Sequence, residues 1–244
     1  MVTDKLTLVT SALAAASLLV AALAGVGHRF GWWHFYTGFV LFIGAAIAGV
    51  IAIAITLFGM MRGGSVVPFF PTRAAILLCA SPAAVLFAFW YWQARSVPPI
   101  HDITTDTQNP PAFQAVLAFR AGAPNPSKYG GAEIAAQQRR AYPDIKSLRL
   151  SNSTARAFAA AQAAVQDMGW EIVAADETAG RIEATDTTFW FGFKDDVVVR
   201  IVPSNGGSLI DVRSVSRAGR SDVGTNAKRI RTFLERLSDH SKKP

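Results

Sequence analysis

Residues 36–61 read YTGFVLFIGAAIAGVIAIAITLFGMM, and this stretch decides the architecture of the chain. It contains no charged residue, and twelve of its residues are Ile, Leu, Val or Phe. A helix needs about 20 apolar residues to cross the hydrocarbon core of a bilayer, where its backbone must satisfy its own hydrogen bonds. At about −0.3 to −0.6 kcal/mol each, the twelve residues favour insertion by about 4–7 kcal/mol. The stretch therefore predicts a membrane span.

Two further uncharged runs flank this span, at about residues 6–27 and 74–94. The second of these contains Pro82, which removes an intrahelical hydrogen bond and predicts a kink. Ala22-Leu23-Ala24 fits a signal-peptide cleavage pattern, but the apolar run before it is long and two spans follow, so we expect it to be retained. We predict a transmembrane region over residues 1–95 with three spans.

The positive charge near the span ends predicts the orientation of the chain. The five basic residues concerned are Lys5, Arg29, Arg62, Arg73 and Arg95. With the amino terminus in the cytoplasm, all but Arg29 and Arg95 lie inside, and the aromatic clusters Trp32–Tyr36 and Trp90–Trp92 share one interface. We therefore expect a multi-pass protein of the cytoplasmic (inner) membrane with a periplasmic C-terminal domain.

Composition excludes several classes of protein. The 244 residues are 51% hydrophobic and only 17% charged, whereas about a quarter of the residues in a soluble domain are charged. No acidic or basic residue lies within a span, which argues against a transporter. Residues 95–244 hold twenty basic and sixteen acidic residues, mixed along the chain, so we expect no nucleic-acid partner. The single cysteine, Cys79, excludes intrachain disulfides and zinc–thiolate sites.

The polar part of the chain predicts three segments. Residues 96–150 form a proline-rich extended segment with a short helix over about 132–141, residues 151–238 form an α+β domain, and residues 239–244 form a tail. One helix begins at Asn152 or Ser153 and ends at Met168, before Gly169. A closing helix begins at Ser221 or Asp222 and buries one apolar side, which includes Asn226, Ile230, Phe233 and Leu237.

Between these helices, residues alternate between apolar and polar with a period of two, which predicts four or five antiparallel strands covered on one face by the two helices. We expect a turn at Lys194–Asp196 that pairs Phe193, Phe191 and Phe189 with Val197, Val199 and Ile201. In the next hairpin, pairing Val202 with Leu209 places Arg200 opposite Asp211. The uncovered face then carries a mixed contact surface made of Trp190, Val198, Arg200, Val202, Asp211, Arg213 and Val215.

Five motifs resemble a known family. They are HDITTD at 101–106, YPD at 142–144, GW at 169–170, FWFGFKDDV at 189–197 and DVRSVSRAGRSD at 211–222. From about Pro98 to Leu237 the chain resembles the family called domain of unknown function 1499 (DUF1499), in its membrane-anchored bacterial form. Members of that family carry the domain alone or behind membrane spans, in bacteria and plastids. The resemblance implies no activity.

His101, Asp102 and Asp106 form a candidate polar cluster with one imidazole and two carboxylates within six residues. Such groups suit a divalent metal or acid–base chemistry. Asp and Thr side chains also bond to nearby backbone N–H groups and fix loops, and the absence of a second His or Cys nearby favours that structural role.

Asp195 and Asp196 are adjacent at the predicted turn. A paired-carboxylate catalyst would need both groups in a cleft, with the pKa of one raised. Because adjacent residues at a turn usually face water, we expect a structural role for both.

Arg213, Arg217 and Arg220, with Ser216 between them, precede a predicted helix start and form the best candidate for an anion or ligand site. Near a membrane the anion could be a lipid headgroup. The competing interpretation, which we favour, is an internal ion-pair network with Asp186, Asp211 and Asp222.

The sequence therefore predicts a multi-pass membrane protein whose domain is a binding or adaptor module of the cell envelope, rather than an enzyme. Its partners would be the lipid bilayer and an envelope protein or an anionic ligand, with no metal and no cofactor. The alternative is a metal-dependent or acid–base enzyme that uses His101, Asp102 and Asp106 with an arginine-lined anion pocket.

Overall fold

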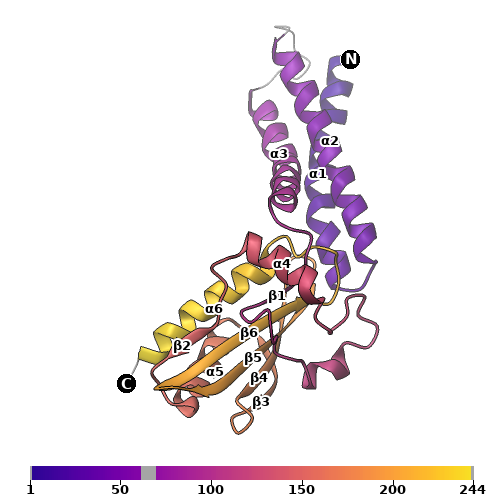
Figure 1. Cartoon of the computed structure of the whole chain (residues 1–244). Helices are drawn as coiled ribbons and strands as arrows, with labels where there is room; N and C mark the ends of the chain where they lie inside the picture. Colours follow the sequence, from indigo (N-terminus) through magenta and orange to yellow (C-terminus); the bar gives the residue numbers. More distant parts are fainter. Residues whose placement is uncertain (1, 62–69, 243–244) are drawn as a thin grey trace. The chain divides into compact units, whose positions relative to one another are not determined.

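A computed structural model describes residues 2–61 and 70–242, so the predicted inside charge Arg62 lies outside the described residues. The chain divides into two compact units. The helical unit contains residues 1–92 together with residues 189–192, and the sheet unit contains residues 93–188 and 193–244. Figure 1 shows the helices and strands of both units.

The helical unit consists of α1 (Val2–Arg29), α2 (Phe35–Met61) and most of α3 (Phe70–Ser96). All three helices are long and apolar enough to cross a membrane, which confirms the predicted candidate spans. Pro82 lies inside α3, and the helix continues on both sides of it.

Small residues allow these helices to approach one another closely. A Cβ atom placed on Gly49 would lie 2.5 Å from the backbone oxygen of Ala80, so α2 and α3 meet at this glycine. The Ser17 hydroxyl in α1 donates a hydrogen bond to the Ala45 oxygen in α2, at 2.8 Å. Close backbone approach and a few interhelical hydrogen bonds are typical of association within a membrane.

The sheet unit is built on an antiparallel sheet in the order β1-β6-β5-β4-β3, and β2 also pairs with β6. The strands are β1 (Asp102–Thr104), β2 (Leu148–Leu150), β3 (Glu171–Asp176), β4 (Arg181–Thr187), β5 (Lys194–Ser204) and β6 (Gly207–Ser216). The helices are η1 (Ala115–Phe119), α4 (Gly131–Ala141), α5 (Thr154–Asp167) and α6 (Thr225–Lys242). The predicted α+β fold class is confirmed, and β1 and β2 are short strands that the sequence did not indicate.

The apolar core lies between one face of the sheet and the helices α5 and α6. Phe233 and Ile230 of α6 are fully buried with Val197, Val199 and other strand residues. The Trp170 ring stacks on the Phe233 ring with centroids 5.5 Å apart. The predicted register of β5 and β6 is confirmed, since Val202 pairs with Leu209, Ile201 with Ile210 and Arg200 with Asp211.

The predicted hairpin of phenylalanines is wrong. Strand β5 begins at Lys194, and Val197 and Val199 pair with Ala184 and Ile182 of β4 rather than with Phe193 and Phe191. The segment Phe189–Gly192 leaves the sheet and belongs to the helical unit. Alternating aromatic residues look like a strand, but here the Trp190 and Phe191 rings pack among the helices, while Phe189 is 91% exposed.

The closing helix also begins later than expected, at Thr225. Gly219, Val223 and Gly224 have φ values of +95°, +48° and +85°, which a right-handed helix cannot contain. The Asp222 carboxylate precedes the helix and accepts hydrogen bonds from the N–H groups of Gly224 and Asn226, at 2.8 and 3.0 Å.

The second face of the sheet is not an open contact surface, contrary to the prediction. Val198 and Val215 are fully buried with Phe113 and Val116, which belong to the loop around η1. Asp211 and Arg213 on the same face are also buried. The proline-rich segment therefore covers this face, because a second apolar layer could not be left in water.

Candidate functional site

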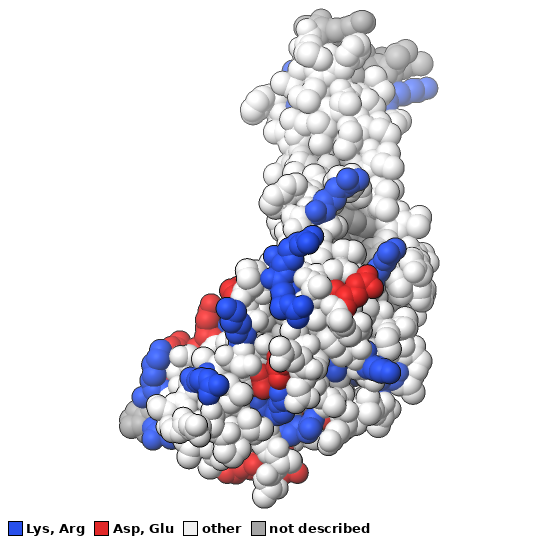
Figure 2. All heavy atoms as spheres, viewed as in Figure 1, with Lys and Arg blue, Asp and Glu red and all other residues white. Residues whose placement is uncertain are grey.

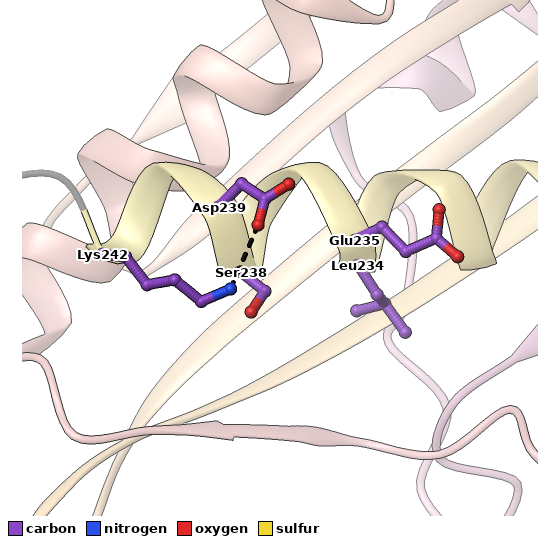
Figure 3. A pocket seen from close by; sticks show the side chains of 5 residues that line it. All are labelled: Leu234, Glu235, Ser238, Asp239 and Lys242. Carbon is purple, nitrogen blue, oxygen red and sulfur yellow. Dashed lines mark hydrogen bonds and ion pairs between the residues drawn. The ribbon is translucent and has the colours of Figure 1, made fainter.

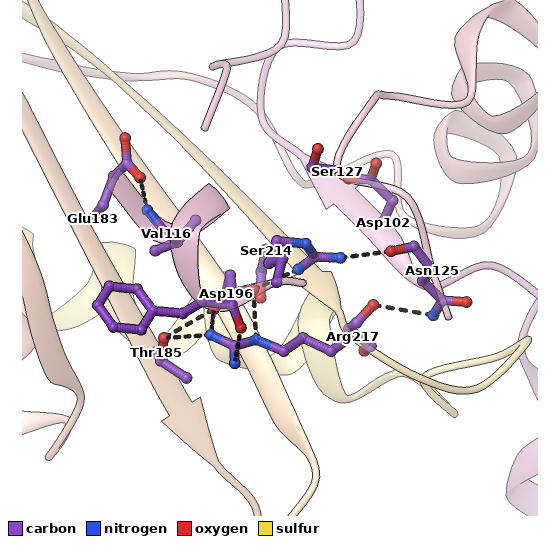
Figure 4. Close-up of polar contacts among 12 residues, drawn as sticks. Asp102, Val116, Asn125, Ser127, Glu183, Thr185, Asp196, Ser214 and Arg217 are labelled. Atoms are coloured by element: carbon purple, nitrogen blue, oxygen red, sulfur yellow. Dashed lines mark hydrogen bonds and ion pairs between the residues drawn. The ribbon is translucent and has the colours of Figure 1, made fainter. Parts of the chain in front are cut away.

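The polar motifs meet on and around strands β5 and β6, and the centre of the arrangement is Asp196. This carboxylate is fully buried and forms ion pairs with two arginines, Arg217 and Arg120. Arg217 donates from Nε and Nη2 to its two oxygens, at 2.9 and 2.7 Å. The Thr185 hydroxyl adds a hydrogen bond of 2.8 Å (Figure 4). Asp196 is thus a buried anion between two cations, and the prediction that it faces water is wrong.

Its neighbour Asp195 points to the opposite face of the sheet, as the period of two requires. Its carboxylate accepts a hydrogen bond of 2.6 Å from Arg229 of α6, which also pairs with Asp186 at 2.7 Å. The Asn226 amide donates to the Ser216 hydroxyl at 3.0 Å and continues this network. The two adjacent aspartates therefore lie in separate clusters and cannot act as a catalytic pair.

Arg213 is buried and binds Asp102 of β1 through two parallel hydrogen bonds, of 2.9 and 2.7 Å. It also donates to the oxygens of Pro111 and Ser127, at 3.1 and 2.7 Å. The rings of Phe113 and Tyr129 lie 5.0 and 5.4 Å from its guanidinium carbon. Because the guanidinium group of Arg213 already binds these acceptors, it fixes the covering proline-rich segment to the sheet and has no room for an external anion.

The remaining members of the predicted polar cluster lie apart from one another. Asp106 pairs with Arg200 at 3.0 Å, and Arg200 also pairs with Asp211 at 2.8 Å. Burial acts to raise the pKa of Asp106, but hydrogen bonds from the N–H groups of Asn109 and Gln108 and from Arg200 outweigh it and hold the pKa below its usual value. His101 instead faces Arg220, with Nδ1 3.4 Å from the Arg220 backbone oxygen.

The three arginines of the predicted anion site diverge. Arg213 and Arg217 are occupied by Asp102 and Asp196, as an internal ion-pair network requires. The Ser216 hydroxyl accepts a hydrogen bond from Asn226. Arg220 alone has an exposed side chain. The partners Asp102 and Asp196 differ from the carboxylates expected from the sequence.

Several residues that complete these clusters gave no signal in the sequence. Arg120 lies in the loop after η1, and Arg229 lies among other basic residues of α6. Glu183 of β4 is fully buried and accepts hydrogen bonds from the N–H groups of Gln114 and Val116, at 2.8 and 3.0 Å. Glu183 alternates with the apolar residues Ile182 and Ala184, so the pattern of β4 places it on the face that was expected to be open and does not indicate its burial.

Neither metal chemistry nor a deep cleft is indicated by the described part of the chain. Among residues 2–61 and 70–242, no group of three His, Cys, Asp or Glu residues could hold a metal ion. An open hollow of about 560 Å³ lies along α6 (Figure 3). It is lined by Leu234, Glu235, Ser238, Asp239 and Lys242, and its Lys242–Asp239 ion pair of 3.1 Å is exposed. These side chains follow one helix and do not converge on a reacting atom.

The loop around η1 exposes apolar side chains although its base is firmly held. Val116 and Arg120 are buried against the sheet, while Leu117 and Phe119 between them are 45% and 63% exposed. They are the only large apolar residues that are exposed within the described part of the sheet unit after α3. This pair is the strongest candidate for a contact surface in that unit.

The segment Phe189–Gly192 is a separate feature, within the helical unit. The Trp190 indole N–H donates to the Ala22 oxygen at 3.1 Å, and its ring meets the Phe42 ring edge-on, with centroids 5.1 Å apart. Gly38 faces the Phe191 ring, and a Cβ placed there would lie 2.9 Å from it. The glycines of α1 and α2 thus leave room for these two rings.

The sequence matches the family described as protein of unknown function (DUF1499) over residues 102–237, which is more than half of the chain. No curated protein matches the chain.

Proposed function

The chain belongs to the DUF1499 family, and from the geometry of its sheet unit we propose that it is a membrane-anchored binding or adaptor module of the cell envelope. The proposal has three parts. The spans hold the protein in the cytoplasmic membrane, the sheet unit lies outside the cytoplasm, and a rigid apolar loop on that unit contacts another envelope protein.

The compartment rests on charge near the spans. Lys5 and Arg73 flank the ends that we assign to the cytoplasm, and Arg29 and Arg95 flank the other ends. Arg62, which lies outside the described residues, adds a third inside charge. This excess follows the positive-inside rule.

A binding role is supported over a catalytic one by the state of the charged residues. Asp102, Asp195 and Asp196 each bind a buried or half-buried arginine. An acid–base catalyst needs a group that can reach a substrate, and its pKa must lie near the working pH. Since His101, Asp102 and Asp106 have separate partners, their geometry gives no support to the alternative of an enzyme built on them.

The observation that carries the proposal is the exposure of Leu117 and Phe119 on a fixed loop. Leaving two large apolar side chains in water costs free energy unless another surface covers them. The Arg120–Asp196 ion pair and the hydrogen bonds from Gln114 and Val116 to Glu183 fix the backbone on both sides. A loop that is already ordered loses little conformational entropy on binding.

A protein partner suits this loop because its exposed surface is uncharged. Between Ala112 and Pro124 the one charged residue is Arg120, which is buried. Depletion of charge around an aromatic residue is typical of the centre of a protein interface.

The test is photocrosslinking in living cells with a photoreactive phenylalanine in place of Phe119. We expect one discrete protein adduct, which weakens when Leu117→Ser is introduced into the same chain. Thr178, an exposed polar residue of the β3–β4 turn, is the matched control position and should give no such adduct. Equal adducts at both positions, no adduct at Phe119, or an adduct with lipid alone would overturn the proposed protein contact.

A further inference from the structure

The loop of residues 217–224 lies against the end of the third candidate span. Gln93 in the last turn of α3 donates from Nε2 to the Val223 oxygen at 3.2 Å. The Ser221 hydroxyl donates to the Pro98 oxygen at 3.4 Å, and the Asp222 N–H donates to the Ile100 oxygen at 3.0 Å. Three contacts therefore hold this loop beside the last turn of α3 and the residues that follow the helix.

The level of the loop relative to a bilayer follows from α3. Trp90, Tyr91 and Trp92 are exposed and directly precede Gln93. Trp and Tyr side chains concentrate at the boundary between acyl chains and headgroups. A helix rises 1.5 Å per residue, so in a bilayer crossed by α3 Gln93 would directly follow the residues at this boundary.

The charges in these segments are segregated by sign. The basic side chains of Arg95, Lys194 and Arg220 are exposed. Lys194 joins the loop because its backbone oxygen accepts a hydrogen bond of 2.9 Å from the Arg217 N–H. The acidic side chains nearest in sequence are all buried, namely Asp102, Asp195, Asp196 and Asp222.

The exposed charges of these segments are thus basic, and the half-buried carboxylate of Asp186, on the strand beside Lys194, is paired with Arg229. Figure 2 shows basic and acidic side chains on one face of the molecule, with the basic ones in the majority. No hydrogen bond or ion pair is found for the side chains of Lys194 and Arg220 within residues 2–61 and 70–242. Both can therefore bind an external anion without breaking an internal contact.

We propose that Arg95, Lys194 and Arg220 form a surface that binds the phosphate groups of anionic lipids in the bilayer crossed by α3. The bilayer is the partner that the candidate spans already imply, and its headgroups carry charge of the complementary sign. Arginine can bind a phosphate through two parallel hydrogen bonds, and lysine contributes a point charge. This inference does not depend on the contact proposed for Phe119.

The test uses the full chain in neutral detergent, titrated with phosphatidylglycerol or phosphatidylcholine, with lipid-bound states resolved by native mass spectrometry. We expect phosphatidylglycerol to bind more tightly, and we expect Arg220→Gln and Lys194→Gln each to weaken its binding about fivefold. Binding of phosphatidylcholine should not change, and Arg220→Lys should retain most of the affinity for phosphatidylglycerol.

Lys242→Gln is the matched control, because Lys242 is an exposed basic residue at the far end of the 18-residue helix α6, about 26 Å from its start. Equal loss in this control would overturn the inference, as would equal affinity for the two lipids. Complete competition by inorganic phosphate would instead indicate a site for small anions and would also overturn it. Unchanged thermal unfolding of the variants shows that folding is not the cause of the effect, since both substituted side chains are exposed.

Discussion

Different interactions stabilise the interior of each of the two units. In the helical unit, backbones approach at Gly38 and Gly49, and aromatic rings fill the remaining space. In the sheet unit, buried arginine–carboxylate pairs fix a covering loop and a helix to the two faces of one sheet. The helical unit depends on glycines, which have no side chain and so allow close packing. The sheet unit depends on buried ion pairs between arginines and carboxylates.

This difference bears directly on function. The residue types that suggest chemistry in the sequence, such as Asp195, Asp196 and Arg213, are used to build the sheet unit. The residues that remain available to other molecules include apolar side chains on the η1 loop and basic side chains such as Arg220. These exposed side chains are the ones that the proposed binding role uses.

The largest effect is expected from breaking one charge pair of the sheet unit. Asp196→Ala leaves Arg120 and Arg217 without their shared carboxylate and should lower the free energy of unfolding by about 3–5 kcal/mol. Guanidinium unfolding followed by tryptophan fluorescence measures this. Asp239→Ala, which breaks the exposed pair with Lys242, should change nothing measurable. Equal stability of the two variants would show that the buried pairs do not hold this unit together.

The corresponding change in the helical unit is the addition of one methyl group. A Cβ on Gly38 would lie 2.5 Å from the Ala24 oxygen and 2.9 Å from the Phe191 ring. Gly38→Ala should therefore destabilise this unit by about 1–3 kcal/mol. Gly44→Ala in the same helix meets open space and serves as the control. Unfolding in mixed micelles by added dodecyl sulfate compares the two, and equal midpoints would contradict the close packing described.

A smaller effect is expected for the polar contact between α1 and α2. Ser17→Ala removes the hydrogen bond to the Ala45 oxygen and should cost about 0.6 kcal/mol, a typical value for such bonds within a membrane. The same micelle titration detects it. Thr56→Val is a useful comparison, because within residues 2–61 and 70–242 the Thr56 hydroxyl bonds to the Ala52 oxygen of its own helix and to no other helix. A cost as large as that of Asp196→Ala would remove the contrast between the two units.

The smallest effect concerns an exposed charge pair. A hydrogen bond from Arg231 outweighs partial burial and lowers the pKa of Asp144 below its ordinary value of 3.8. The pair therefore stabilises the fold above that value and loses its contribution as the pH falls through the lowered pKa. Because both side chains are exposed, the contribution is at most about 0.5 kcal/mol. Arg231→Gln should match the wild type at low pH and be slightly less stable at neutral pH.

A destabilisation by Arg231→Gln that persists at low pH would mean that the arginine acts through packing, for example against the Tyr142 ring 5.4 Å away.

The features that the sequence predicted are those set by local pattern. The spans were predicted from long uncharged runs, and the buried face of α6 was predicted from apolar residues with a period near 3.6. The register of β5 and β6 was predicted from the turn at Ser204–Gly207 and the need to bury one face of the sheet. A change of register by one residue would move every side chain of the strand to the other face of the sheet and would place polar residues in the apolar core.

The features that failed depend on partners far away in the chain. Phe189–Gly192 alternates like a strand, but the glycines that receive its rings lie more than 150 residues earlier. Asp196 resembles a turn residue, and its partner Arg120 is 76 residues away in a loop without a pattern. Pairing of this kind is a property of the fold and leaves no local signal.

The most direct test of the account asks on which side of the membrane the sheet unit lies. In a chain with Cys79→Ala and Thr178→Cys, the exposed β3–β4 turn carries the single thiol. A second chain with Cys79→Ala and Lys5→Cys is the control, because its single thiol lies near the start of α1, on the side that we assign to the cytoplasm. We predict that a membrane-impermeant maleimide labels residue 178 in intact cells and labels residue 5 only after the membrane is opened. Labelling of residue 178 only after permeabilisation would contradict the proposed location.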